Sequence, residues 1–113
     1  MKKIEAKIRK SKFKEVKRSL VEAGFESFNY HLTRCISKKS EKKFYRGVAF
    51  DSKSSDRIDF SIYVNNKDVE KVLNILKDSG RSGDAQDAYI CVFGVEQSYV
   101  LGHVDGKDKL IQI

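Results

Sequence analysis

Two histidines and two cysteines are the side chains of this 113-residue chain that are best suited to metal binding or to nucleophilic and acid–base catalysis. His31 and His103 stand far apart in the sequence, and neither has a second histidine, cysteine or carboxylate at the spacing of a metal site. Cys35 and Cys91 fall in strand-like runs, where a cysteine usually acts as a small hydrophobic side chain. No nucleophile–base pair is visible. We therefore expect no enzyme, no metal and no required cofactor.

A second chemical feature is the polar stretch at about residues 37–57, which separates two runs of alternating apolar residues. A loop of this length inside a small domain is usually functional or disordered. Its lysines could neutralise a phosphate or an acidic partner, or could form a solvated charged surface. The tripeptide Tyr45-Arg46-Gly47 could contact a partner at the tip of the loop, where glycine favours a turn, or could simply be exposed.

The charge of the chain is uneven. Residues 1–57 hold 17 Lys+Arg and 7 Asp+Glu, whereas residues 58–113 hold 6 and 9. A basic half can meet phosphate, nucleic acid or a membrane surface. No apolar run approaches the roughly 20 residues of a membrane span, and two cysteines are too few for a disulfide scaffold. We expect a cytoplasmic protein with a single domain over residues 1–113.

Hydrophobic periodicity predicts the elements that carry these residues. Strands are expected at 2–9, 27–36, 58–64 and 89–95, with a short fifth strand at 98–104 and a turn with an undetermined end at 105–113. Helices are expected from Ser11, which can cap, to Gly24, and from Asn65 or Asn66 to Gly80. The order β-α-β-β-α-β predicts an α+β, ferredoxin-like fold with both helices on one face of an antiparallel sheet.

The other face of that sheet is expected to be uncovered, so that it either binds a ligand or packs against another copy. The period of two places polar residues from the second and third strands on it: Asn29, His31, Thr33, Asp59, Ser61 and Tyr63.

Several segments resemble the PII signal-transduction family. They are M-K-K-I-E-A-x-I at the N-terminus, K-x-x-x-V-K-x-x-L-x-E-A-G over Lys12–Gly24, and Y-R-G at Tyr45–Gly47 in the long loop. The turn S-G-D-A-Q-D-A-Y and the strand I-C-V-F-G-V match the family's T-G-K-I-G-D-G-K and I-F-V-F-D-V. The resemblance covers about 100 residues. It implies a homotrimer in which the uncovered sheet faces meet, with three projecting T-loops.

The resemblance also implies a ligand and a partner. ATP or ADP would bind between subunits, and the T-loop would dock on a protein, such as a membrane transporter or a metabolic enzyme. The candidate positions for nucleotide binding are Asn29, Lys38, Lys39, Arg57, Gly83, Gln86, Asp87 and His103. The positions that the resemblance assigns to partner binding in the T-loop are Lys42, Lys43, Phe44, Tyr45, Arg46, Gly47 and Phe50.

The chain departs from the family at several of these positions. In the phosphate-binding turn, Asp84 and Tyr89 replace lysines, and the arginine pair of the last strand falls on Val100 and Gly102. Each lost charge-assisted contact should cost ~1.5–3 kcal/mol. A nucleotide would have to bind with fewer charges, or a different ligand would replace it. Phe50 takes the place of the tyrosine that the family uridylylates, so that modification has no hydroxyl to use.

An RNA-binding module is the alternative function, because RNA-recognition domains share this element order and an open sheet face. The basic charge fits. However, the third strand reads I-D-F-S-I-Y-V and lacks the alternating glycine and aromatic signature of that class.

Overall fold

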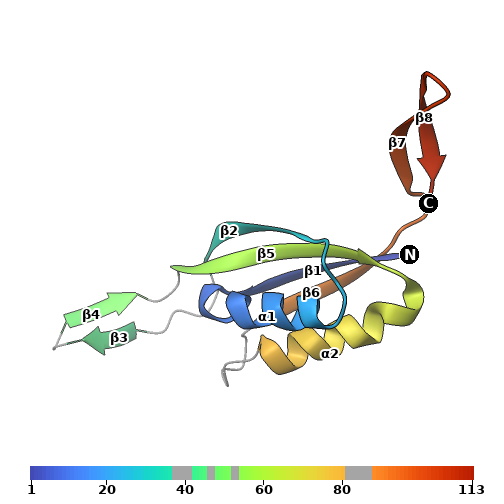
Figure 1. Ribbon diagram of the computed structural model, residues 1–113. Coiled ribbons are helices and arrows are strands. Elements are labelled where there is room, and N and C mark those ends of the chain that lie inside the picture. Colours follow the sequence, from blue (N-terminus) through green and yellow to red (C-terminus); the bar gives the residue numbers. More distant parts are fainter. Residues whose placement is uncertain (37–41, 46–47, 52–53, 81–87) are drawn as a thin grey trace.

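The computed structural model describes residues 1–36, 42–45, 48–51, 54–80 and 88–113. Their elements follow in the order β1 (Lys2–Arg9), α1 (Lys10–Glu22), β2 (Asn29–Ile36), β3 (Lys42–Tyr45), β4 (Val48–Asp51), β5 (Ser54–Val64), the 3-10 helix η1 (Asn66–Asp68), α2 (Val69–Ser79), β6 (Ala88–Gly94), β7 (Tyr99–Val104) and β8 (Lys107–Gln112). Figure 1 shows a central sheet with α1 and α2 together on one face.

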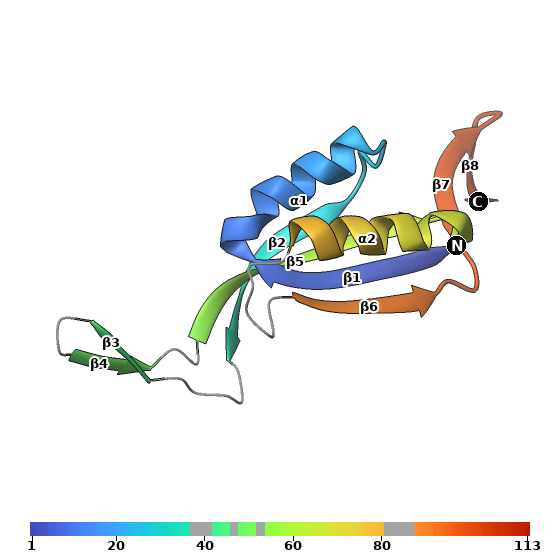
Figure 2. The same cartoon turned by 90° about the horizontal axis from the view of Figure 1, so that it is seen from below.

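The central sheet has the strand order β2-β5-β1-β6, and every neighbouring pair is antiparallel. This order and the two helices on one face confirm the ferredoxin-like α+β fold expected from the sequence. Seen from below, α1 and α2 lie side by side across the strands (Figure 2). The opposite face of the sheet has no helix above it (Figure 1).

The core lies between the helices and the sheet. Strand alternation sends every second residue of β1 and β5 inward, where the helices meet them with one apolar stripe each. Phe60 is the largest fully buried residue, and its ring contacts Phe28 edge-on at a centroid distance of 5.4 Å. The buried residues of the core are Ile4, Ala6, Ile8, Val16, Leu20, Ile58, Phe60, Ile62, Val64, Val72 and Leu76.

The two helices end at the expected glycines. Gly24 has a φ of +93°, its N–H bonds Val21 O at 3.0 Å, and the N–H of Phe25 bonds Leu20 O at 2.9 Å. These two bonds form a Schellman motif, in which the left-handed residue is normally glycine. At Gly80 an added Cβ would lie 2.6 Å from the backbone oxygen of Leu76, so a side chain there would clash.

The helix starts differ from expectation. Ser11 does not cap α1, since the helix already begins at Lys10, with Arg9 as N-cap and no side-chain cap bond. Asn65 precedes η1 and accepts the Asp68 N–H at its backbone oxygen, again without a side-chain cap, so α2 starts at Val69.

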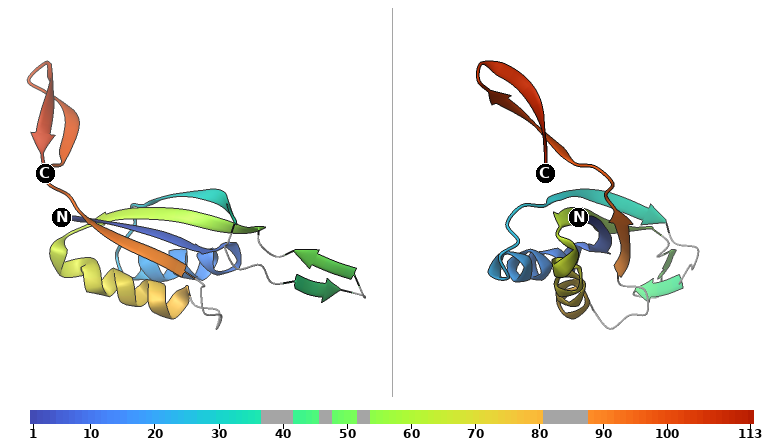
Figure 3. Two further views of the ribbon diagram at one scale, coloured as in Figure 1. Left: turned by 180° about the vertical axis from the view of Figure 1, so that it is seen from behind. Right: turned by 90° about the vertical axis from the view of Figure 1, so that its right-hand side faces the viewer.

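Two hairpins stand away from the sheet at its opposite ends (Figure 1 and Figure 3), and the molecule extends over 69 × 26 × 22 Å. β3 and β4 pair within the region that the sequence analysis treated as loop, and β5 begins at Ser54, four residues before the expected Ile58. The expectation that the chain ends in a turn after 104 was wrong: β7 and β8 pair around Asp105 and Gly106, whose φ values of 52° and 74° are typical of a type I′ turn.

Candidate functional site

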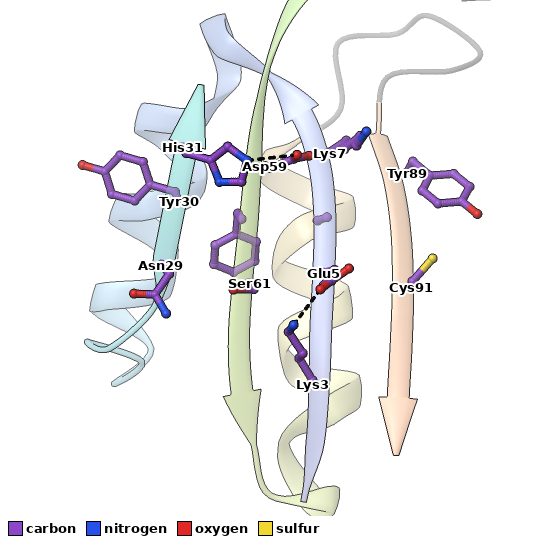
Figure 4. A pocket seen from close by; sticks show the side chains of 12 residues that line it. Lys3, Glu5, Lys7, Asn29, Tyr30, His31, Asp59, Ser61, Tyr89 and Cys91 are labelled. Atoms are coloured by element: carbon purple, nitrogen blue, oxygen red, sulfur yellow. Dashed lines mark ion pairs between the residues drawn. The ribbon is translucent and has the colours of Figure 1, made fainter. Parts of the chain in front are cut away.

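The open face of the sheet is organised as transverse rows of side chains, because antiparallel register brings residues of four strands into line. One row runs His31, Asp59, Lys7, Tyr89 across β2, β5, β1 and β6. The next row holds Asn29, Ser61, Glu5 and Cys91, and a third places Tyr63, Lys3 and Phe93 in register. The first two rows and Lys3 line a concave pocket of about 370 Å³ (Figure 4).

Opposite charges alternate over this pocket. His31 Nε2 lies 3.3 Å from Asp59 Oδ2, and Lys3 Nζ lies 2.7 Å from Glu5 Oε1 (Figure 4). The hydrogen bond to Glu5 raises the pKa of the Lys3 ammonium above its ordinary value. Two lysines, Lys3 and Lys7, therefore stand among two carboxylates, Glu5 and Asp59, and this balance of charge suits burial against another polar surface better than capture of a free anion.

Aromatic side chains border these charges. Tyr63 is 55% exposed, Tyr89 67% and Phe93 46%. A hydrogen bond with Cys91 raises the pKa of the Tyr89 phenol above its ordinary value. Exposed aromatic side chains are enriched at protein–protein interfaces relative to the rest of a protein surface.

Within the described ranges, no group of three or more histidine, cysteine or acidic side chains could hold a metal ion. Cys91 is a free, half-buried thiol that pairs with Glu5 across β1 and β6. No helix in the described part of the chain is long and apolar enough to cross a bilayer.

Of the residues assigned to nucleotide binding, the three that the structure describes, Asn29, Arg57 and His103, lie apart from one another in the subunit. Asn29 lines the open-face pocket at the start of β2. Arg57 is half-buried on β5 between Thr33 and Arg9, where its Nη1 donates to the backbone oxygen of Asp56 at 3.4 Å. The remaining positions Lys38, Lys39, Gly83, Gln86 and Asp87 lie outside the described residues.

His103 lies on β7, in the hairpin at the end of the sheet opposite the T-loop region (Figure 1). Its Nδ1 is 2.9 Å from Asp108 Oδ1 across the β7–β8 pair. One chain therefore cannot bring His103 to Arg57, and a site that uses both requires a second copy.

Of the positions expected to bind a partner through the T-loop, some lie in strands β3 and β4 and the others lie outside the described residues. Lys42, Lys43, Phe44 and Tyr45 form β3, and Phe50 lies in β4 opposite Lys43. Arg46 and Gly47 lie outside the described residues. Their role in partner binding stays a prediction.

The sequence analysis missed the contribution of β6 to the open face. The period of two in residues 89–93 would have placed Tyr89, Cys91 and Phe93 beside the charged residues of β1. It also missed the ion pairs, since register decides which charges meet and the register of distant strands is not visible in local sequence.

The chain is similar to the nitrogen regulatory protein P-II of Nostoc punctiforme, with 32% identity over 98 residues that cover 86% of this chain and 88% of that protein. The P-II protein of a Synechocystis species is 31% identical over 97 residues, covering 85% and 87%. That of Pyropia yezoensis is 29% identical over 98 residues, covering 86% and 88%. No protein-family model matches the chain.

Proposed function

This chain belongs to the PII signal-transduction family, and on that premise we propose that it is a cytoplasmic, trimeric regulator of nitrogen metabolism that senses an adenine nucleotide. The nucleotide lies in the cleft between two copies, and residues 37–57 transmit its presence to a protein partner such as a transporter or a metabolic enzyme. The observation that carries the proposal is the similarity to P-II proteins over almost the whole chain. It also favours a regulator over an RNA-binding module.

The shape of the subunit supports self-assembly. The open face exposes three aromatic side chains, and the β7–β8 hairpin exposes Leu101 to 72% and Leu110 to 69%. A two-stranded hairpin is at best marginally stable in water, so this one needs a surface to pack against. A neighbouring copy supplies that surface, and its open face covers the aromatics.

Assembly also explains the scattered nucleotide positions. Asn29 and Arg57 belong to the sheet of one subunit, whereas His103 is carried outward by the hairpin (Figure 1). A hairpin that docks on the next copy brings His103 toward that copy's sheet. The nucleotide site is then complete only in the oligomer, and nucleotide binding is sensitive to how the copies pack.

The ligand is expected to be an adenine nucleotide without a strong preference for the triphosphate. Asp84 and Tyr89 stand where the family has lysines, so the charge that would favour ATP over ADP is reduced. Arg57 is the fixed cation at the base of the T-loop region and is expected to interact with the phosphates or with the partner-binding loop.

The experiment combines mass measurement with calorimetry. Light scattering should give three times 13.0 kDa, about 39 kDa, and titration should give saturable binding of ADP near one ligand per subunit. Arg57→Gln should weaken ADP binding by about tenfold, which corresponds to 1.4 kcal/mol. Arg34→Gln is the matched control, because it removes the same charge from the same end of the sheet, where Arg34 faces solvent and pairs with Asp56 at 3.4 Å.

The outcomes separate the parts of the proposal. A monomer in solution would contradict the trimer. A trimer that gives no heat with ATP, ADP or AMP would contradict nucleotide sensing and leave the assembly intact. Equal losses for the two arginine variants would show that Arg57 acts only through general charge.

A further inference from the structure

Helix α1 and the residue before it form the most basic segment that the structure describes. Residues 9–18 contain six Lys+Arg and one Glu, a net charge of +5 in a chain whose total is +7. The second helix offers an internal comparison: residues 66–79 contain three Lys and three Asp+Glu, a net charge of zero. The excess charge is thus a property of one helix.

The fold does not require this charge. The positive end of a helix dipole favours acidic side chains in the first turn and basic ones in the last turn. α2 follows that rule with Glu70 and Lys77, whereas α1 has neither and begins with Lys10 and Lys12. Because the cations of α1 stand where they oppose helix formation, their presence points to a role other than stability.

The cations face away from the core. Val16 and Leu20 form the buried stripe of α1, and the outward side chains Lys10, Lys14, Lys17 and Arg18 are exposed. Within α1, Lys12 Nζ lies 4.0 Å from Glu15 Oε1. These exposed cations lie in the helical layer (Figure 2), opposite the open sheet face, so a trimer built on that face leaves them outward.

Apolar side chains accompany the cations at the same edge of the molecule. Tyr30 and Leu32 of β2 are 50% and 55% exposed, and Val21 of α1 is 44% exposed. The Tyr30 ring contacts Phe13 of α1 at a centroid distance of 4.5 Å, and Lys17 Nζ lies 5.9 Å from its centre. We call this set the α1 surface: Lys10, Lys14, Lys17, Arg18, Val21, Tyr30 and Leu32.

We propose that the α1 surface binds the surface of an anionic phospholipid membrane. Lysine ammonium groups on flexible stems suit a diffuse array of phosphates better than one fixed ligand. A basic cluster of this size on an amphipathic helix is typical of recognition of acidic lipids, and tyrosine favours the headgroup level. The surface is a convex helix, and the pocket described above lies on the other face of the sheet, which favours a flat partner over a small molecule. The proposal is independent of nucleotide sensing.

The test is co-sedimentation of the full chain with phosphatidylcholine vesicles that contain about 30% phosphatidylglycerol, at ionic strengths of about 0.05 M and 0.3 M. The variant Lys10→Glu/Lys14→Glu/Arg18→Glu reverses three of the four cations of the α1 surface. The matched control is Lys67→Glu/Lys71→Glu/Lys77→Glu at exposed positions of η1 and α2. Both lower the net charge from +7 to +1. A glutamine version, Lys10→Gln/Lys14→Gln/Arg18→Gln, tests the same charges without reversal, and thermal unfolding checks that each variant is folded.

The wild type should bind the anionic vesicles and not pure phosphatidylcholine, with weaker binding at the higher salt. The α1 variants should lose at least about tenfold in affinity, while the α2 control should change by less than about twofold. Equal losses in both sets would overturn the proposal, since total charge alone would then account for binding. Absence of vesicle binding, or tight binding of a short RNA in its place, would overturn it as well.

Discussion

Replacing Tyr63 and Phe93 together by alanine separates folding of the subunit from its assembly. Both side chains lie on the open face, 55% and 46% exposed, and neither belongs to the buried core. An enclosed aromatic side chain buries roughly 150–250 Å², so about 100 Å² of each is left for another copy to cover. At about 25 cal/mol per Å², the pair contributes ~5 kcal/mol per subunit to assembly, or ~15 kcal/mol per trimer.

That loss is far greater than the expected cost to the subunit itself, which for residues outside the core is about 1 kcal/mol or less. In sedimentation velocity at micromolar concentration, the double variant should therefore shift from about three times 13.0 kDa to 13.0 kDa and keep its helical circular dichroism. Leu32→Ala is the matched control, because this half-exposed side chain of β2 is in register with the buried Ile58 and does not line the open-face pocket. A double variant that remains trimeric would refute the assignment of the open face as the interface.

Three further outcomes follow from the structure. Gly80→Ala should lower the free energy of unfolding by about 1–3 kcal/mol in urea titration, because the added Cβ would lie 2.6 Å from the Leu76 backbone oxygen. The control Gly94→Ala, where only the flexible end of Lys2 lies near, should change the free energy of unfolding by less than about 0.5 kcal/mol. Lys10→Glu should raise the free energy of unfolding by ~0.3–1 kcal/mol, since it places an acid at the start of α1; a decrease would refute the dipole argument. Replacing residues 38–53 by a short glycine–serine linker should leave the oligomeric mass unchanged and abolish capture of a protein partner; loss of the oligomer would show that this region is structural.

The arrangement of layers could be predicted from the sequence because period and glycine placement are local. The alternation of Ile4, Ala6 and Ile8 fixed the bounds of β1 and its buried face, and Gly24 ended α1 as expected. Ser11 misled the prediction of the helix start. Serine is a favoured N-cap residue, but β1 passes directly into α1, and Arg9, with an extended backbone, occupies the N-cap position.

The second hairpin could also have been predicted. Asp105-Gly106 between two runs with apolar residues is the turn signal of a type I′ hairpin, and it was treated as a chain end. The pairing of His31 with Asp59, and of Lys7 with both Asp59 and Tyr89, could not be predicted in the same way, because these strands are distant in sequence and register depends on how the whole sheet packs.

The geometry of the subunit sets the three surfaces proposed above in different directions. The open face of the sheet, which we propose as the interface between copies, lies opposite the helices, and the β3–β4 hairpin extends beyond one end of the sheet (Figure 1). The α1 surface lies in the helical layer on the remaining side (Figure 2). A hairpin that docks end-on into a membrane protein would hold α1 away from a flat bilayer, so the two modes of membrane contact exclude one another for a given subunit. A nucleotide that changes the conformation of the hairpin would then shift the protein between a state docked on a partner protein and a state bound to lipid. It could do so only if its affinity for these two states differs.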